Sequence, residues 1–203
     1  MDTEVRAERG LNAPQAEGGL CRRLIQGEEA AYEELWRRFG PGLRRYATAR
    51  LGGDEELAED VAVQSLAAAV RSIRSFDPRR ASLTVWVYGV ARRVLIVELR
   101  GQRRRTAIPK SAEVNLETTR ELAVDGDLAS ELTGRMEARR QVALLARHLS
   151  EAEMEVLLLS FVEEFDMKEV AHILGRSGRA VYSLLHRAKA KARERLVHDA
   201  AHG

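Results

Sequence analysis

The stretch from Met167 to Leu185, MKEVAHILGRSGRAVYSLL, constrains the fold of this 203-residue chain more than any other. Its apolar residues recur at helical spacing on both sides of a glycine, which predicts two short helices that each bury one face. Gly175 stands where a left-handed residue ends the first helix, and Ser177 stands where an N-cap begins the second. The segment therefore predicts a helix-turn-helix.

The second of these helices continues into a basic sequence. From Arg176 to Arg195 there are seven Lys or Arg residues and one acid, Glu194, so the local charge is 7 − 1 = +6 in a chain of formal net charge +2. A solvated helix face usually mixes its charges, whereas an excess of one sign fits a polyanionic partner. We therefore favour DNA binding here over a helical hairpin that binds nothing.

The composition predicts an all-α protein, because 45% of the residues are hydrophobic, only 5% are aromatic, and β-branched alternation is nearly absent. Cys21 is the single cysteine, which excludes an internal disulfide and a cysteine zinc cluster. The five histidines do not pair at metal-ligand spacing, and no phosphate loop or nucleophile elbow is present. We expect no catalytic residues, no metal and no cofactor.

Hydropathy and the N-terminal sequence bear on location. No apolar run approaches the length that crosses a bilayer, and the acidic start MDTEVRAERG lacks the apolar segment of a signal peptide. We therefore expect a cytoplasmic protein without membrane insertion.

Changes in composition divide the chain into four parts. Residues 1–19 are expected to be a flexible tail, 20–105 a helical domain, 106–135 an acidic linker, and 136–203 the domain with the helix-turn-helix. The first domain should begin its helices near Glu28, with a break or kink at Gly40–Pro41–Gly42. Further helices are expected over about 55–75 and 83–104, with a loop at FDPRRAS between them. Tyr32, Leu35, Phe39, Leu43 and Tyr46 form its first core stripe.

Charge is sorted along the chain. Between Arg79 and Arg105 there are eight arginines and one acid, Glu98, giving 8 − 1 = +7. Between Thr106 and Gly134 there are six acids and two basic residues, giving 2 − 6 = −4. The chain thus carries two basic surfaces with an acidic segment between them.

With these features in view, the chain resembles the RNA polymerase sigma factors of the extracytoplasmic-function (ECF) group. AED at Ala58–Asp60, FDP at Phe76–Pro78, Trp86 and AR at Ala91–Arg92 fall at the spacing of that family. The segment LSEAEMEVLLLSFVEEFDMKEVAHILGRS, from Leu149, is the more specific match. The resemblance covers roughly residues 20–105 and 136–197.

The resemblance implies a non-catalytic polymerase subunit. Its first domain would bind the polymerase clamp and melt the minus-ten promoter element, and its second would bind the minus-thirty-five element beside the polymerase flap. The acidic linker would run toward the active-site channel. The family also suggests an anti-sigma protein as a partner.

Residue by residue, the resemblance and the side-chain chemistry give three sets of candidate contacts. Those to core polymerase are Asp60, Val63 and Gln64. Those to the minus-ten element are Phe76, Arg79, Arg80, Trp86, Arg93, Arg100, Arg103 and Arg104, although Trp86 could equally be a core residue. Those to the minus-thirty-five element are Arg176, Ser177, Arg179, Tyr182, Ser183, His186, Arg187 and Lys189. Val181 and Leu185 are expected to be core.

The sequence departs from the family at several of these positions. Val63 and Gln64 stand where members usually carry Gln-Glu, and Arg93 and Val97 replace Asn and Asp. Tyr182 replaces a basic residue. The departure at Val63 bears on the contact to the polymerase clamp, whereas Arg93, Val97 and Tyr182 suggest unusual promoter preferences. Two other hypotheses remain open: an operator-binding helix-turn-helix regulator, and an interaction protein derived from the sigma fold that no longer starts transcription.

Overall fold

The computed structural model describes residues 14–107 and 148–200, and within these ranges every regular element is helical. The elements are α2 (Pro14–Gln26), α3 (Glu29–Arg50), α4 (Glu55–Ser72), η1 (Ile73–Ser75), α5 (Leu83–Ala107), α7 (Glu151–Leu157), η2 (Leu158–Val162), α8 (Met167–Leu174) and α9 (Gly178–Ala200). The all-α expectation is confirmed. Most of the predicted acidic linker lies outside the described residues.

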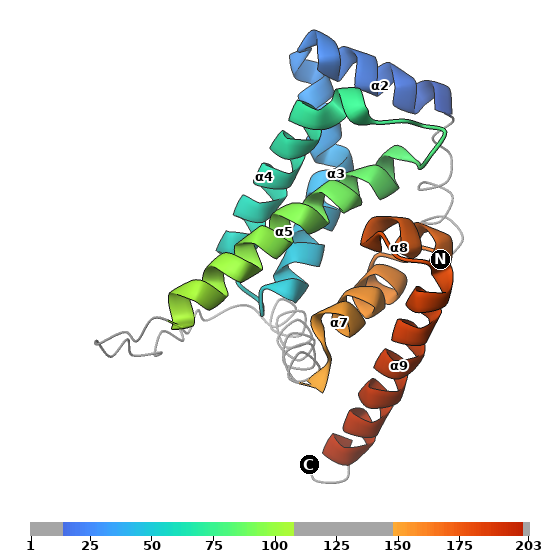
Figure 1. Cartoon of the computed structure of the whole chain (residues 1–203). Helices are drawn as coiled ribbons and strands as arrows, with labels where there is room; N and C mark the ends of the chain where they lie inside the picture. Colours follow the sequence, from blue (N-terminus) through green and yellow to red (C-terminus); the bar gives the residue numbers. More distant parts are fainter. Residues whose placement is uncertain (1–13, 108–147, 201–203) are drawn as a thin grey trace, which may run out of the picture.

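The first bundle consists of α3, α4 and α5, with α2 lying across one end (Figure 1). The predicted stripe of α3 supplies its core, because Leu35, Phe39, Leu43 and Tyr46 are all buried. Tyr32, the fifth residue of that stripe, is 39% exposed and lies outside the core. On α5, the first residue, Leu83, is fully buried.

The predicted tail extends too far into the chain. Residues 14–19 belong to α2, and the buried carboxylate of Glu17 connects that helix to the bundle. Its Oε2 accepts a hydrogen bond from the backbone N–H of Leu83 at 3.0 Å, and its Oε1 accepts one from Arg38 at 3.2 Å. Glu17 thereby satisfies a free N–H at the start of α5, a tertiary role that sequence composition does not reveal.

Of the predicted break or kink in α3, the break is wrong, because the helix continues through Pro41. A proline inside a helix removes one backbone hydrogen bond, yet packing can outweigh that loss. Here Phe39 and Leu43 are buried on either side of it. The glycines have another use: Gly42 allows a close approach of Tyr88, whose hydroxyl would lie only 2.5 Å from a Cβ placed there.

The second bundle is formed by α7, η2, α8 and α9, and it contains the predicted helix-turn-helix. Ser150 forms a capping box with Glu153, and Asp166 forms a second one at the start of α8. Gly175 ends α8 with φ of 61°, the left-handed conformation expected there. Ser177 Oγ accepts a hydrogen bond from the N–H of Ala180 at 3.3 Å, which confirms the predicted N-cap of α9.

The two bundles pack directly against each other, with α8 lying against α5 and η2 against α3 (Figure 1). Residues far apart in sequence therefore share one continuous set of buried side chains. This arrangement leaves one side of α5 and most of α9 at the surface.

Candidate nucleic-acid and protein interfaces

The N-terminal part of α9 presents most of its predicted contact residues to solvent. Arg179, Tyr182, Ser183 and His186 are all exposed, and Tyr182 retains 62% of its accessible surface. The hydroxyl of Ser183 donates a hydrogen bond to the carbonyl of Arg179 at 3.0 Å. Exposed arginine, tyrosine and histidine on one helix can contact phosphates and base edges in a major groove.

The other predicted residues of this region lie either in the turn before α9 or on the buried face of α9. Arg176 is exposed next to the N-cap Ser177, and the free backbone N–H groups of a helix start also favour phosphate. Val181 is fully buried, as expected. Leu184 is buried as well, whereas Leu185 is only partly buried, so Leu184 contributes more to the core than the sequence suggested.

Two predicted contacts of α9 are already engaged within the protein. The Nε of Arg187 lies 3.6 Å from Glu153, and Lys189 lies over the ring of Phe161, 4.9 Å from its centroid. Lys191 donates a hydrogen bond to Glu153 at 2.8 Å. This bond is the main cause that lowers the pKa of Glu153 to about 2.

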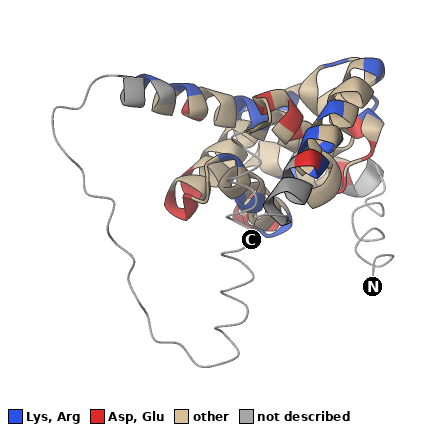
Figure 2. Ribbon diagram, turned by 90° about the horizontal axis from the view of Figure 1, so that it is seen from below, with Lys and Arg blue, Asp and Glu red and all other residues tan. Residues whose placement is uncertain are grey.

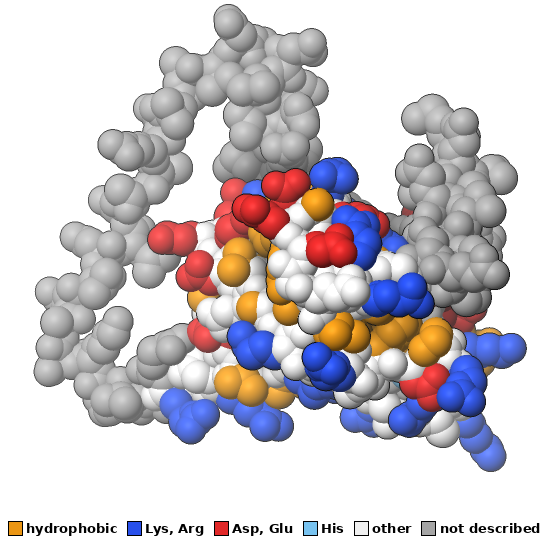
Figure 3. All heavy atoms as spheres, turned by 90° about the horizontal axis from the view of Figure 1, so that it is seen from above, with side chains coloured by type: hydrophobic (Ala, Val, Ile, Leu, Met, Phe, Trp, Pro, Cys, Tyr) orange, Lys and Arg blue, Asp and Glu red, His pale blue; other side chains and the backbone are white. Residues whose placement is uncertain are grey.

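A second basic surface follows α5. Arg93, Val97 and Arg100 are exposed along it, and the C-terminal part of the helix extends beyond the body of the protein with basic residues on its surface (Figure 2). Arg104 donates to the carbonyl of Arg100 at 3.4 Å, while the side chain of Arg103 lies outside the described residues. Many Lys and Arg side chains also lie along the lower edge of the space-filling view, where acidic side chains are fewer (Figure 3). Such a surface fits a phosphate backbone.

The loop before α5 joins this surface. Arg79 and Arg80 are exposed in it. The rings of Phe76 and Trp86 pack at 5.6 Å between centroids, and both side chains are partly buried. Trp86 is therefore a packing residue whose ring stays partly accessible, and its contact to DNA remains a prediction.

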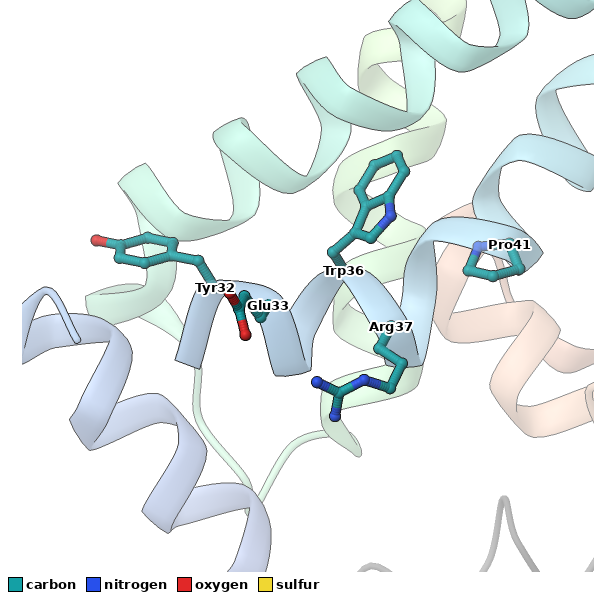
Figure 4. A pocket seen from close by; sticks show the side chains of 5 residues that line it. All are labelled: Tyr32, Glu33, Trp36, Arg37 and Pro41. Atoms are coloured by element: carbon teal, nitrogen blue, oxygen red, sulfur yellow. The ribbon is translucent and has the colours of Figure 1, made fainter. Parts of the chain in front are cut away.

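The third predicted surface lies on α4, where Asp60, Val63 and Gln64 are exposed. The sequence did not indicate that Tyr32 and Trp36 of α3 would extend it. Figure 4 shows these two rings on successive turns of α3. Together with Val63, Leu66 and other residues of α4 they line a groove of about 340 Å³, and a second hollow of about 630 Å³ lies beside Tyr32, Trp36 and Pro41.

Exposed tryptophan and tyrosine next to apolar residues are typical of protein interfaces. Trp36 is 39% exposed and Val63 is 50% exposed. The departure from the family at Val63 therefore lengthens an apolar surface between α3 and α4. This groove is suited to an amphipathic helix from another protein.

Within residues 14–107 and 148–200, no group of three or more His, Cys, Asp or Glu side chains is arranged to hold a metal ion. Over the same described ranges, no helix has the length and apolar character of a membrane span.

Two family models match the chain. The model described as Sigma-70 region 2 matches residues 35–105, and the model described as Sigma-70, region 4 matches residues 139–191. The first covers the surfaces on α4 and α5, and the second covers the helix-turn-helix.

Individual proteins give the same indication. The ECF RNA polymerase sigma factor BldN of Streptomyces coelicolor is 24% identical over 83% of this chain and 61% of its own length. The ECF RNA polymerase sigma factor SigG of Mycobacterium tuberculosis is 30% identical over 70% of this chain and 42% of its own. The chain thus spans about half the length of these relatives.

Among solved structures, that of CnrH in complex with the cytosolic domain of CnrY has a similar fold. It aligns with a TM-score of 0.66 and 23% identity, over 90% of this chain and 98% of CnrH. The alignment includes both helical bundles.

Proposed function

Because the chain belongs to the ECF group of the sigma-70 family of RNA polymerase sigma factors, we propose that it is a promoter-specific transcription initiation factor. One observation carries this proposal: two separate helical bundles, matched to regions 2 and 4, each present an exposed basic helix face. A promoter read at two separated elements requires two such faces.

In this proposal residues 20–105 form the domain for core polymerase and the minus-ten element. Melting needs contacts to single-stranded DNA, and the exposed arginines of α5 together with the Phe76–Trp86 pair supply cations and aromatic faces for it. The groove between α3 and α4 would seat a helix of the polymerase clamp, with Trp36 as an anchor.

Residues 136–203 form the domain for the minus-thirty-five element. Helix α9 enters the major groove through Arg179, Tyr182, Ser183 and His186. Tyr182 offers apolar contact to a thymine methyl group in place of a basic contact to guanine or phosphate. The same bundle would contact the polymerase flap, and residues 106–135 would connect the domains through the active-site channel.

A protein partner is part of the proposal as well. The similar CnrH structure holds the cytosolic domain of CnrY, and an anti-sigma protein is the corresponding partner here. The protein acts without its own catalytic site or cofactor in this scheme, because the polymerase supplies the chemistry.

The test is gel filtration with bacterial core RNA polymerase, followed by transcription from a randomised promoter library. We expect co-elution and initiation from one promoter class with two elements. Trp36→Ala should weaken the association about tenfold, as the loss of an interface anchor does. Ile25→Ala is the matched control, because Ile25 is 41% exposed on α2, outside the groove.

Co-elution without initiation would contradict the proposed function and favour an interaction protein that does not start transcription. Duplex binding by the free protein without polymerase association would favour an operator-binding regulator. Equal effects of Trp36→Ala and Ile25→Ala on the association with polymerase would show that the groove is not part of the polymerase interface.

A further inference from the structure

One apolar side chain lies in the middle of the basic face of α5. Val97 is 66% exposed, more than any other large hydrophobic side chain that the structure describes. Single exposed apolar residues are common on protein surfaces and need no explanation by themselves. Val97 differs because charged residues surround it on the helix face that we propose to bind DNA. Its role is therefore sought in the bound DNA.

Packing within the protein does not explain Val97. Leu95 is 1% exposed, and Val94 and Leu99 are partly buried against the core, so these three side chains hold this part of α5 to the first bundle. Two residues after Leu95, Val97 lies about 200° away around the helix. It therefore points away from the bundle, and no fold requirement selects an apolar residue there.

Val97 is flanked by two cations on the same face of α5. Arg93 lies four residues before it and Arg100 three residues after it, and both are exposed. The adjacent Arg92 differs, because its Nε lies 3.1 Å from Glu155 in an ion pair. Arg93 and Arg100 are about 10 Å apart along the helix axis, so their long side chains can bind phosphates on either side of a base. That base then faces Val97.

The departure from the family at this face changes what the face can read. Arg93 and Val97 stand where members carry Asn and Asp, so the face loses one acid and gains one base. A carboxylate accepts a hydrogen bond from the amino group of cytosine, whereas valine cannot. Valine instead offers an apolar contact, which suits the C5-methyl group of thymine. The substitution thus removes a means of reading an amino group and supplies one for reading a methyl group.

The same chemistry disfavours the other bases. A polar base edge that is pressed against valine loses hydrogen bonds to water and gains no partner. Thymine presents a methyl group, which the other three bases lack. Burial of one such group corresponds to about a fourfold gain in affinity.

We propose that Val97 is a specificity-determining residue for the minus-ten element. It selects a thymine through the C5-methyl group, while Arg93 and Arg100 bind the flanking phosphates. This inference rests on the proposed function and deepens it, because it assigns one base of the promoter to one side chain.

The test uses holoenzyme assembled from the full-length protein and core RNA polymerase, on a promoter selected from the randomised library. Each thymidine of the minus-ten element, on either strand, is replaced in turn by deoxyuridine, which lacks only the C5-methyl group. The apparent Kd of each fragment is measured for the wild type, Val97→Ala and Ile25→Ala. Ile25 is the matched control, because it is 41% exposed on α2, away from α5. Circular dichroism checks that each variant keeps its helices.

For the wild type we expect binding about fourfold weaker when uridine replaces thymidine at the position that faces Val97. Val97→Ala should lose the effect of uridine at this position, because the two changes remove the two halves of one contact. Ile25→Ala should show the wild-type pattern. Val97→Asp should prefer cytosine over thymine at the same position, because a carboxylate can accept from the cytosine amino group.

The same uridine effects in the wild type and Val97→Ala at every position would overturn the inference. A Val97→Asp holoenzyme that keeps the thymine preference of the wild type would overturn it as well. Either result, obtained with a holoenzyme that initiates from the selected promoter, leaves the proposed function in place. A wild-type protein that does not bind core polymerase or does not initiate would instead overturn the proposed function, and the inference with it.

Discussion

At the scale of single residues, Glu153 shows how one buried carboxylate connects two helices. Its side chain accepts hydrogen bonds from the backbone N–H and the hydroxyl of Ser150, both at 2.9 Å, and so completes the cap of α7. It also binds Lys191 of α9 at 2.8 Å. The position of α9 relative to α7 therefore depends on an ionised Glu153.

This dependence predicts an effect of pH on stability. Lys191 holds the pKa of Glu153 at about 2, against an ordinary value of 4.5. A carboxyl group with a lower pKa in the folded state stabilises the fold above its unfolded pKa, and this contribution is lost as the pH falls toward the folded value. Glu153→Gln should therefore lower the free energy of unfolding at pH 7, with a difference from wild type that narrows between pH 4.5 and about 2.

Urea denaturation of both proteins across this pH range measures the difference. The matched control is Glu194→Gln, an exposed position on α9. A difference for Glu153→Gln that stays constant with pH would contradict the assignment of this ion pair as a stabilising one.

At the scale of elements, α9 combines a buried face with an exposed basic one. Val181, Leu184 and Ala188 are buried at helical spacing, which fixes the direction in which Arg179 and Tyr182 point outward. The two caps before α8 and α9 set where each helix begins. Local sequence thus determines which face of α9 is exposed.

Arg179→Ala should weaken promoter binding and reduce the steepness of its salt dependence. Each lost phosphate contact should change the slope of log K against log salt by about 0.9. The binding of holoenzyme to a promoter fragment is measured over a series of salt concentrations. Arg71→Ala, which removes an exposed arginine of α4, should leave the slope unchanged. Parallel lines for Arg179→Ala and wild type would exclude a phosphate contact at Arg179.

The same local signals explain which elements could be predicted from sequence. The helix-turn-helix has a glycine C-cap, a serine N-cap and apolar periodicity that all agree, and the structure confirms each. The start of α2 was not predicted, because Gly18 and Gly19 suggested a flexible tail. The helix is held instead by a tertiary contact of Glu17 that the local sequence does not show. In α3 the glycines and proline suggested a break that packing overrides.

The interfaces were only partly predictable for a related reason. Basic helix faces appear directly in the sequence as runs of arginine and lysine. The groove that includes Trp36 depends on how α3 packs on α4. The ion pair between Arg45 and Glu163 joins two residues that are 118 positions apart in the sequence. Periodicity along one segment carries no information about such pairings.

At the scale of the whole molecule, the absence of a side chain at Gly42 allows the bundles to meet. A Cβ at Gly42 would lie 2.5 Å from the Tyr88 hydroxyl, whereas a Cβ at Gly89 would have nothing within 4 Å. Both glycines lie inside helices, where alanine is favoured by about 1 kcal/mol. The two positions therefore differ in the space available for an added methyl group.

Gly89→Ala should therefore raise the free energy of unfolding by up to about 1 kcal/mol. Gly42→Ala should lower it, because an overpacked site costs roughly 1–3 kcal/mol and the displaced Tyr88 hydroxyl loses its hydrogen bond to Glu163. Denaturant titration compares the two variants with the wild type. A stabilising effect of Gly42→Ala as large as that of Gly89→Ala would show that Tyr88 moves away without loss.

The long sequence separation of the Arg45–Glu163 pair has a consequence for the newly made protein. At a synthesis rate of roughly 5–20 residues per second, the 118 residues from the one after Arg45 up to Glu163 take roughly 6–24 s to synthesise. The first bundle, whose own contacts are local, can fold during that delay. In each new molecule, α3 and α5 are therefore made before the second bundle that packs against them. The contact between the two bundles can form only after α7, α8 and α9 have been synthesised.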